Sequence, residues 1–172
     1  LTMDFKNNGN IVLVIGKTEG HIDQSLLARL ILDEKNGPPP EVNLFNEKNN
    51  GETLLDLIEK DYVKSAHDVS LGGIITAISK MCIKGGKGIE LKIPKYLINE
   101  IEYFFSEDQG RYIIEVTSGD LKNVTKILDK NSVHYDEIGK IIDKNMIINQ
   151  KTKVTIDELK SYNTNWLKNY MV

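Results

Sequence analysis

A continuous apolar run, Ile11-Val-Leu-Val-Ile15, constrains the fold of this chain more than any other segment. Five apolar residues without alternation, ended by Gly16, are typical of a β-strand that is buried on both faces. We therefore expect this strand to be central in a sheet. The rest of the chain alternates between strand-like and helix-like patterns, which predicts an α+β fold, layered like α/β proteins, with a mixed β-sheet covered by helices.

The patterns along the chain set the expected elements. Apolar residues recur every three or four positions between Ile22 and Ile31, which predicts a helix that Asp23 caps and that Gly37-Pro-Pro-Pro40 stops. We expect further helices at 51–60, 74–85 and 120–128, and strands at 63–66, 89–93, 111–117 and 133–138. Segments 141–148 and 153–156 could form a terminal hairpin. Residues 46–50 are the stretch expected to be less ordered.

Composition limits the class of protein. With 172 residues, of which 40% are hydrophobic and 27% charged, the chain can bury one core, so we expect a single domain over residues 1–172. The net charge of −3 comes from interspersed charges, which argues against a nucleic-acid partner. No apolar run approaches the ~20 residues of a membrane span. Cys82 is the only cysteine, which excludes an internal disulfide and favours a buried thiol and a reducing, cytoplasmic compartment.

A glycine-containing corner, Ser65-Ala-His-Asp-Val-Ser-Leu-Gly-Gly73, lies between a predicted strand and a predicted helix. Asp68 and Ser70 offer short polar groups there, and the glycine pair removes side chains that would keep an anion from the first free N–H groups of the helix. The corner therefore suits a nucleotide, with or without a metal. The alternative is structural, because Ser and Asp are common N-caps and paired glycines can serve the backbone alone.

Six segments, in one order and spacing, resemble a known family. They are Gly16-Lys-Thr-Glu-Gly-His-Ile-Asp-Gln-Ser25, Gly37-Pro-Pro-Pro40, Ala66-His-Asp-Val-Ser-Leu-Gly-Gly73, Phe105-Ser-Glu-Asp-Gln-Gly-Arg-Tyr112, Ile138-Gly139 and Trp166-Leu-Lys-Asn-Tyr-Met171. Together they resemble the C-terminal domain of the synthetase subunit (PurL) of bacterial small-type phosphoribosylformylglycinamidine synthase, which is related to aminoimidazole ribonucleotide synthetase. The resemblance implies a C-terminal fragment of a longer multi-domain enzyme, with a partly ferredoxin-like fold.

The resemblance also implies a reaction. Enzymes of this family use ATP and Mg²⁺ to activate the amide of formylglycinamide ribonucleotide, and ammonia then displaces phosphate to give formylglycinamidine ribonucleotide in purine biosynthesis. A glutaminase subunit supplies the ammonia, and a small accessory subunit completes the assembly. The expected partners are these two subunits and the remaining domains of the same enzyme. The matching domain is expected to border a structural nucleotide site that holds ATP or ADP, and the fragment alone is expected to be inactive.

The resemblance assigns roles to individual residues. Asp68 is expected to bind Mg²⁺, and the expected cofactor-binding residues are His67, Ser70, Gly72 and Gly73. Glu107, Asp108, Gln109 and Arg111 match a substrate-holding element, with a plain surface loop as the alternative. No catalytic residue is expected within the chain, since the catalytic histidine of the family belongs to a region outside it.

Two departures from the family pattern and two further hypotheses remain open. Leu71 stands where the family usually has Asp, and Asp23 where it commonly has Gly, so the nucleotide site could be degenerate. In the first hypothesis, the chain belongs to a related ATP-dependent enzyme, such as aminoimidazole ribonucleotide synthetase, selenophosphate synthetase, thiamine-phosphate kinase or a hydrogenase-maturation factor. In the second, it is an interaction module without nucleotide affinity. The apolar ending with Trp166 and Tyr170 suggests a docked C-terminus, or packing against another domain.

Overall fold

The central feature of the fold is one mixed β-sheet, seen in a computed structural model that describes residues 1–34, 36–94 and 99–171. The described strands are β1 (Ile11–Ile15), β2 (Val63–Asp68), β3 (Gly88–Leu91), β4 (Tyr112–Val116), β5 (Tyr135–Ile142), β6 (Asn145–Ile148) and β7 (Thr152–Thr155). Their spatial order is β2-β4-β1-β5-β3-β6-β7. The described pairs are antiparallel except β3 and β6, which run parallel. The mixed sheet predicted from the sequence is confirmed.

Strand β1 lies inside the sheet, between β4 and β5. Its residues from Val12 to Ile15 have no exposed surface, because helices cover both faces of the sheet at this point. Burying each such side chain contributes about 1.5–3 kcal/mol relative to exposure. The prediction of a central strand at 11–15 is therefore confirmed.

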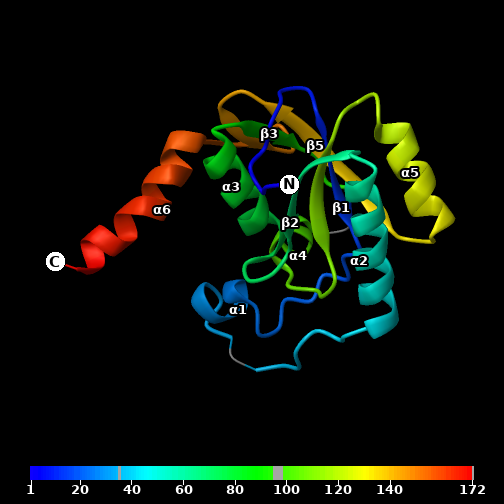
Figure 1. The fold of residues 1–172 in the computed structure, drawn as a ribbon. Helices are drawn as coiled ribbons and strands as arrows, with labels where there is room; N and C mark the ends of the chain where they lie inside the picture. Colours follow the sequence, from blue (N-terminus) through cyan, green and yellow to red (C-terminus); the bar gives the residue numbers. More distant parts are fainter. Residues whose placement is uncertain (35, 95–98, 172) are drawn as a thin grey trace.

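The described helices are shown in Figure 1: α1 (Leu26–Leu30), α2 (Leu44–Glu59), α3 (Gly73–Gly85), α4 (Glu100–Phe105), α5 (Leu121–Lys130) and α6 (Ile156–Tyr170). One face of the sheet is covered by α3, by α4 and by the first turn of α6, through Ile78, Phe104 and Ile156. The other face is covered by α2 and α5, through Leu57 and Leu128.

Helix α2 is longer than the sequence pattern predicts. It begins at Leu44 instead of Gly51, and residues 46–50, expected to be less ordered, form its first turns. Asn43 caps it by accepting a hydrogen bond from the N–H of Asn46 at 3.0 Å. Asn50 is buried and donates from Nδ2 to the carbonyl of Gly110 at 2.9 Å. These tertiary and capping bonds outweigh the polar composition on which the expectation rested.

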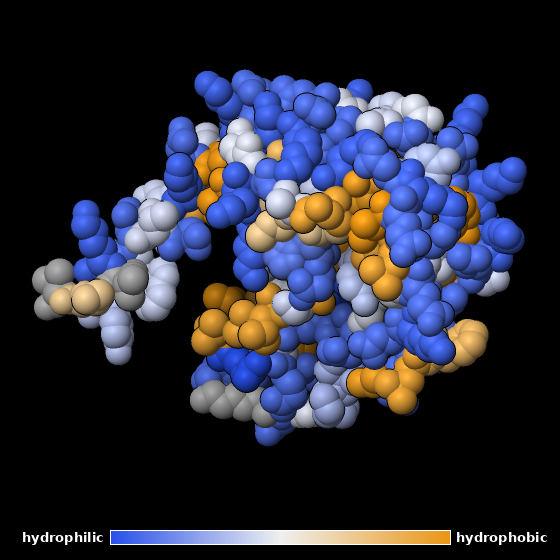
Figure 2. All heavy atoms as spheres, viewed as in Figure 1, coloured by the Kyte–Doolittle hydropathy of each residue, from blue (hydrophilic) through white to orange (hydrophobic). Residues whose placement is uncertain are grey.

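Helix α1 is shorter than predicted and starts later. Its N-cap is Ser25, whose side chain accepts from the N–H of Ala28, and not Asp23. Gln24 has φ of 63°, a left-handed backbone that prevents a helix from running through it. The C-terminal side of α1 leaves Leu30, Ile31 and Leu32 exposed. Figure 2 shows hydrophobic surface over this helix, on the side that faces α6.

The C-terminal helix projects from the body of the molecule (Figure 1). Its first turn packs on α3 through Ile156 and Leu159, but Trp166 is 60% and Tyr170 81% exposed. The interpretation of a C-terminus docked on this domain is therefore wrong. No helix in the described ranges has both the length and the apolar character to cross a bilayer.

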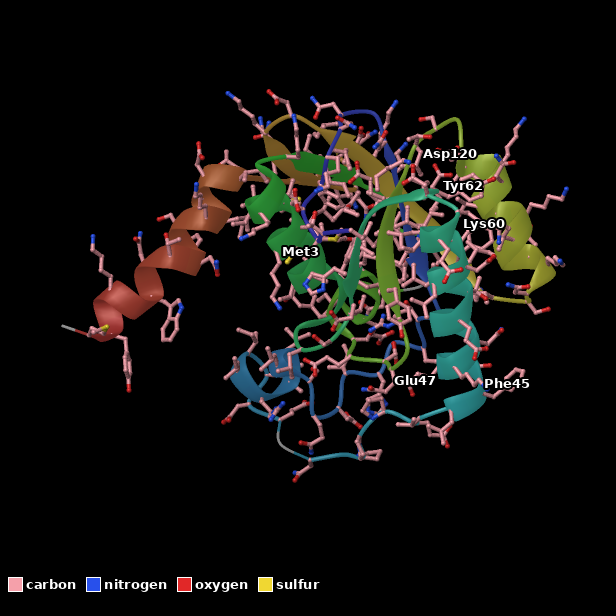
Figure 3. The ribbon with its side chains drawn as sticks, in the orientation of Figure 1. Met3, Phe45, Glu47, Lys60, Tyr62 and Asp120 are labelled. Atoms are coloured by element: carbon pink, nitrogen blue, oxygen red, sulfur yellow. The ribbon has the colours of Figure 1, made fainter. Side chains whose placement is uncertain are left out.

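The side chains at the start of α2 diverge (Figure 3). Phe45 points away from the body and is 78% exposed, whereas Glu47 lies on the side of the first turns that faces the neighbouring loops. The first turns of α2 thus bring polar groups to the same edge of the sheet at which β1 and β2 end.

Candidate functional site

One edge of the sheet gathers the segments singled out in the sequence. The antiparallel register places Ile15 of β1 and Asp68 of β2 opposite Tyr112 at the start of β4. Three segments therefore meet there: residues 16–21 after β1, the corner 67–73 at the end of β2, and the turn 106–111 before β4. We refer to this region as the loop edge.

The corner after β2 presents its polar side chains to solvent. The Asp68 side chain is 64% exposed. Its Oδ1 atom lies 2.9 Å from Nδ1 of His67, within hydrogen-bonding distance. Ser70 and Leu71 are exposed as well. Asp68 and Ser70 are thus accessible to a ligand or to another part of an assembly, and the imidazole of His67 orients the carboxylate of Asp68.

The glycine pair of the corner has a packing role. A Cβ atom on Gly73 would lie 2.6 Å from the carbonyl oxygens of Phe104 and Ser106, and one on Gly72 would collide with the side chain of Thr76. Both residues have positive φ, 82° for Gly72 and 70° for Gly73, which favours glycine. The space in front of Gly73 is filled by protein backbone, so these glycines do not form an open cradle for a phosphate. Their predicted role as cofactor-binding residues stays a prediction.

The turn before β4 turns its carboxylates inward. Oε1 of Glu107 accepts from the N–H groups of Leu26 and Gly72, at 2.8 Å each. Asp108, 6% exposed, accepts through Oδ2 from the N–H groups of Glu19 and Gly20 at 3.1 Å. Oδ1 of Asp108 accepts from the N–H of His21 at 3.2 Å. Two of the four side chains expected to hold substrate, Glu107 and Asp108, thus accept hydrogen bonds from backbone of the same domain.

Arg111 is buried, with 1% of its surface exposed. Its guanidinium donates to the carbonyls of Asp108 and Ser106 at 3.1 and 2.8 Å, and to Oγ1 of Thr18 at 3.0 Å. Burial lowers the pKa of Arg111, and the carboxylate of Asp108, 3.7 Å away, opposes that shift. In this position the guanidinium organises the turn, and it does not reach a ligand from solution.

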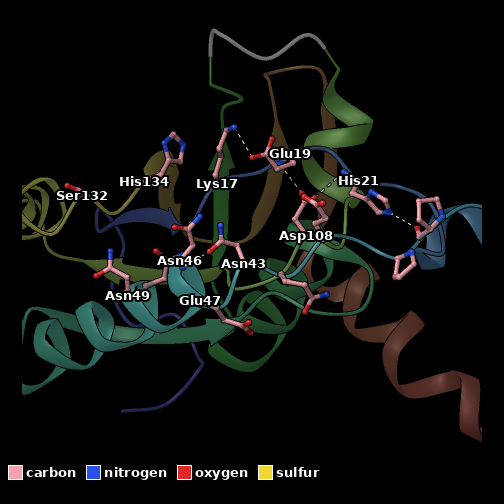
Figure 4. Close-up of a pocket in the computed structure, with 16 residues that line it drawn as sticks. Lys17, Glu19, His21, Asn43, Asn46, Glu47, Asn49, Asp108, Ser132 and His134 are labelled. Carbon is pink, nitrogen blue, oxygen red and sulfur yellow. Dashed lines mark hydrogen bonds and ion pairs between the residues drawn. The ribbon is translucent and has the colours of Figure 1, made fainter.

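A polar cavity of about 800 Å³ opens at the loop edge (Figure 4). It lies between the loop after β1 and the first turns of α2, and Asp108 and Gln109 form part of its wall. Lys17 and Glu19 form an ion pair of 2.7 Å at its rim, and Nε2 of His21 lies 2.9 Å from the carbonyl of Pro38. The corner residues His67, Asp68 and Ser70 are outside this wall.

Sequence reasoning missed the amide groups of this cavity. The side chains of four asparagines line it, all from the N-cap and first turns of α2: Asn43, Asn46, Asn49 and Asn50. Because the sequence pattern starts this helix at Gly51 and leaves residues 46–50 less ordered, it assigns no role to these asparagines. Their spacing of three and four residues was the available signal, since such residues share one side of a helix.

Electrostatic coupling links the cavity to the corner through Tyr112. Burial raises the pKa of the Tyr112 phenol, and the carboxylates of Glu47, in the cavity wall, and Asp68, in the corner, raise it further. Within the described residues, no group of three or more His, Cys, Asp or Glu side chains is arranged to hold a metal. Asp68 is the one carboxylate of the corner between Ser65 and Gly73, so a Mg²⁺ ion held there would take its other ligands from elsewhere.

Comparisons with known proteins agree with the resemblance seen in the sequence. A family model described as AIR synthase related protein, C-terminal domain, matches residues 7–150. The phosphoribosylformylglycinamidine synthase subunit PurL of Pelagibacter ubique is 68% identical over 171 residues, which are 99% of this chain and 23% of that protein. The PurL of Bartonella henselae is 33% identical over the same share of both chains. The chain thus spans about a quarter of the length of these relatives.

Solved structures share the fold. Thermotoga maritima PurL complexed with FGAR superposes with a TM-score of 0.75 at 18% identity, covering 93% of this chain and 29% of that one. Thiamine-monophosphate kinase from Stenotrophomonas maltophilia gives a TM-score of 0.58 at 14% identity, over 87% of this chain and 52% of that one. The fold is therefore that of PurL-type domains, and the greater likeness is to PurL.

Proposed function

This chain belongs to the family of AIR synthase related proteins, C-terminal domain, and we propose that it works as the C-terminal domain of a phosphoribosylformylglycinamidine synthase synthetase subunit. The 68% identity to one such subunit, across 99% of this chain, is the observation that carries the proposal. The complete enzyme would convert formylglycinamide ribonucleotide and ammonia to formylglycinamidine ribonucleotide at the expense of ATP.

The cofactors and partners follow from the same proposal. Structures of T. maritima PurL are described as complexes with ATP and ADP, and another as PurLQS, which supports a nucleotide and additional subunits. For this protein we propose ATP or ADP, Mg²⁺, the remaining domains of the enzyme, a glutaminase and a small accessory subunit. A single cysteine that is free and buried supports a cytoplasmic setting.

Within the domain, we propose that the exposed corner contacts what the rest of the enzyme holds. Asp68 would supply one oxygen to Mg²⁺, and Ser70 a hydroxyl to the nucleotide, with His67 orienting Asp68. Gln109, in the cavity wall, is the member of the turn best placed to meet substrate. Glu107, Asp108 and Arg111 would act on a ligand only by shaping the loops, because their polar atoms contact this domain.

A chimera tests this function. The matching 171 residues of the P. ubique subunit would be replaced by this chain, and ATP- and ammonia-dependent formation of formylglycinamidine ribonucleotide would be measured. We expect activity within about tenfold of the parent, and none from the 172-residue chain alone. A chimera that folds and is inactive would refute the assignment. Asp68→Ala in the chimera should weaken nucleotide retention and thermal stability more than turnover.

A further inference from the structure

We propose that the carboxylates of Glu107 and Asp108 act as built-in anions at the loop edge. They accept hydrogen bonds from the backbone N–H groups that a phosphate would otherwise bind. The proposal concerns this domain alone and does not depend on the reaction of the complete enzyme. It disagrees with the expectation that nucleotide phosphates approach the glycine pair.

Asp108 fills a backbone cradle in the loop after β1. Three successive N–H groups, from Glu19 to His21, converge on its carboxylate at 3.1–3.2 Å. Gly20, with φ of 84°, allows the backbone to curl in this way. Consecutive N–H groups that form such a concavity are a common anion-binding arrangement in proteins. Here the anion is part of the chain, because the Asp108 side chain is 93% buried beneath the loop.

Glu107 likewise binds backbone at the glycine corner, through its side-chain carboxylate. The N–H of Gly72, the N-cap of α3, donates to its carboxylate, and the N–H of Gly73 donates to the carbonyl of Ser70 at 3.0 Å. The N–H groups of Gly72 and Gly73 at the start of α3 are therefore already hydrogen-bonded within the protein. The backbone carbonyls of Phe104 and Ser106 press against Gly73, so a phosphate approaching it would meet oxygen atoms of the protein.

Arg111 keeps the two carboxylates in place. It holds the carbonyls of Ser106 and Asp108, on either side of Glu107, and its charge lies 3.7 Å from Asp108. Charge-assisted hydrogen bonds of this kind are about twice as strong as neutral ones. A phosphate would have to displace a buried, charge-paired carboxylate to reach the cradle. A nucleotide phosphate at this edge would therefore have to use groups other than these backbone N–H groups, such as the exposed side chains of Asp68 and Ser70.

The unmodified chain gives the first test. Inorganic phosphate, and separately ADP with Mg²⁺, would be titrated to millimolar concentration while the backbone amide resonances are followed by NMR. We expect the amides of Glu19, Gly20, His21 and Gly72 to stay unchanged. Saturable shifts of these amides in either titration would overturn the proposal.

Replacement by free anions gives the second test. Asp108→Ala removes the carboxylate and leaves the cradle empty, so we expect the thermal midpoint to fall by several degrees and acetate or phosphate to restore part of that loss. The wild-type protein and the Gln109→Ala variant, altered at the next side chain of the turn, should not respond to either anion. Equal responses in all three proteins would contradict the proposal. If Asp108→Ala does not fold, the same comparison is made with Glu107→Ala and the amide of Gly72.

Discussion

At the scale of single residues, Glu115 shows how this chain handles a buried charge. It lies on β4 without exposed surface, and four donors surround its carboxylate. The N–H groups of Lys6 and Asn7 donate to it at 2.9 and 3.1 Å, Nδ2 of Asn10 at 2.7 Å and Oγ of Ser65 at 2.8 Å. The carboxylate thereby fastens the N-terminal segment to the sheet.

Glu115→Gln is expected to destabilise the protein by about 2–4 kcal/mol, because the new amide NH₂ would face donors and leave them unsatisfied. Urea unfolding followed by circular dichroism would measure the change. Glu137→Gln is the matched control, since Glu137 is an exposed residue on the neighbouring part of the sheet. Equal, small effects of both variants would contradict the assigned role.

Cys82 gives a prediction for alkaline pH. Burial raises the pKa of its thiol from 9.0 to about 12, so the folded state favours the neutral form. This contribution to stability is complete below pH 9 and is lost as the pH rises from 9 to 12. The difference in unfolding free energy between the wild type and Cys82→Ala should therefore shrink above pH 9, by at most about 4 kcal/mol. A difference that stays constant between pH 7 and 11 would argue against it.

The residues that the sequence singled out lie at the loop edge, but the sequence could not tell what they bind. A carboxylate that accepts from a ligand and one that accepts from its own backbone look the same in sequence. For Asp108 the deciding neighbours are Glu19 to His21, almost ninety positions away. For Arg111 burial was decisive, and a motif carries no information on burial.

At the scale of secondary-structure elements, the junction of β2, α3 and α4 depends on Gly73. Gly73→Ala is expected to cost about 2–4 kcal/mol, from the left-handed backbone and from contact with two carbonyls at the C-terminal end of α4. Gly86→Ala is the control, because Gly86 also has positive φ but a Cβ there meets nothing within 4 Å, so about 1 kcal/mol is expected. Thermal unfolding of both variants measures the difference. Equal losses would show that the backbone conformation alone matters.

Helix α6 allows a complementary prediction. Removal of residues 162–172 should cost less than about 1 kcal/mol, because the side chains of Tyr162, Trp166 and Tyr170 are exposed. Ile156→Ala, in the packed first turn, should cost about 2–4 kcal/mol. Chemical denaturation compares the two. A truncation as costly as Ile156→Ala would mean that the distal half of α6 packs on this domain.

The strands were easier to predict than the helices. Strand β1 and the β6–β7 hairpin follow from local patterns, with residues 141–142 belonging to β5. Helix α4 was not predicted, since its six residues are too few for a clear helical period. The first turns of α2 were missed because their stability comes from Asn43 and from a bond to Gly110, which lies far along the chain.

At the scale of the whole molecule, the two apolar clusters share one sheet. Val12 and Val14 of β1 pack into one cluster, and Leu13 and Ile15 pack into the other. Loss of the helices on one face would expose the side chains on that face of every central strand. The two layers are therefore energetically coupled through the strands that they share.

We expect residues 1–172 to unfold as one cooperative unit. Scanning calorimetry should give a calorimetric enthalpy equal to the van't Hoff enthalpy, as for a single two-state domain. Ile78→Ala in one layer and Leu57→Ala in the other should lower the same transition. A second transition, moved by only one of these variants, would show that the layers are separate folding units.

The position of β1 also affects how the chain is made. Its partners β4 and β5 begin at Tyr112 and Tyr135, so roughly 120 further residues must follow β1 out of the ribosome before both sides of this strand can be paired. Until then the backbone N–H and C=O groups of β1 lack their final partners. During synthesis this apolar strand therefore stays without its two partner strands until β4 and β5 follow, which favours binding of nascent-chain chaperones in that interval.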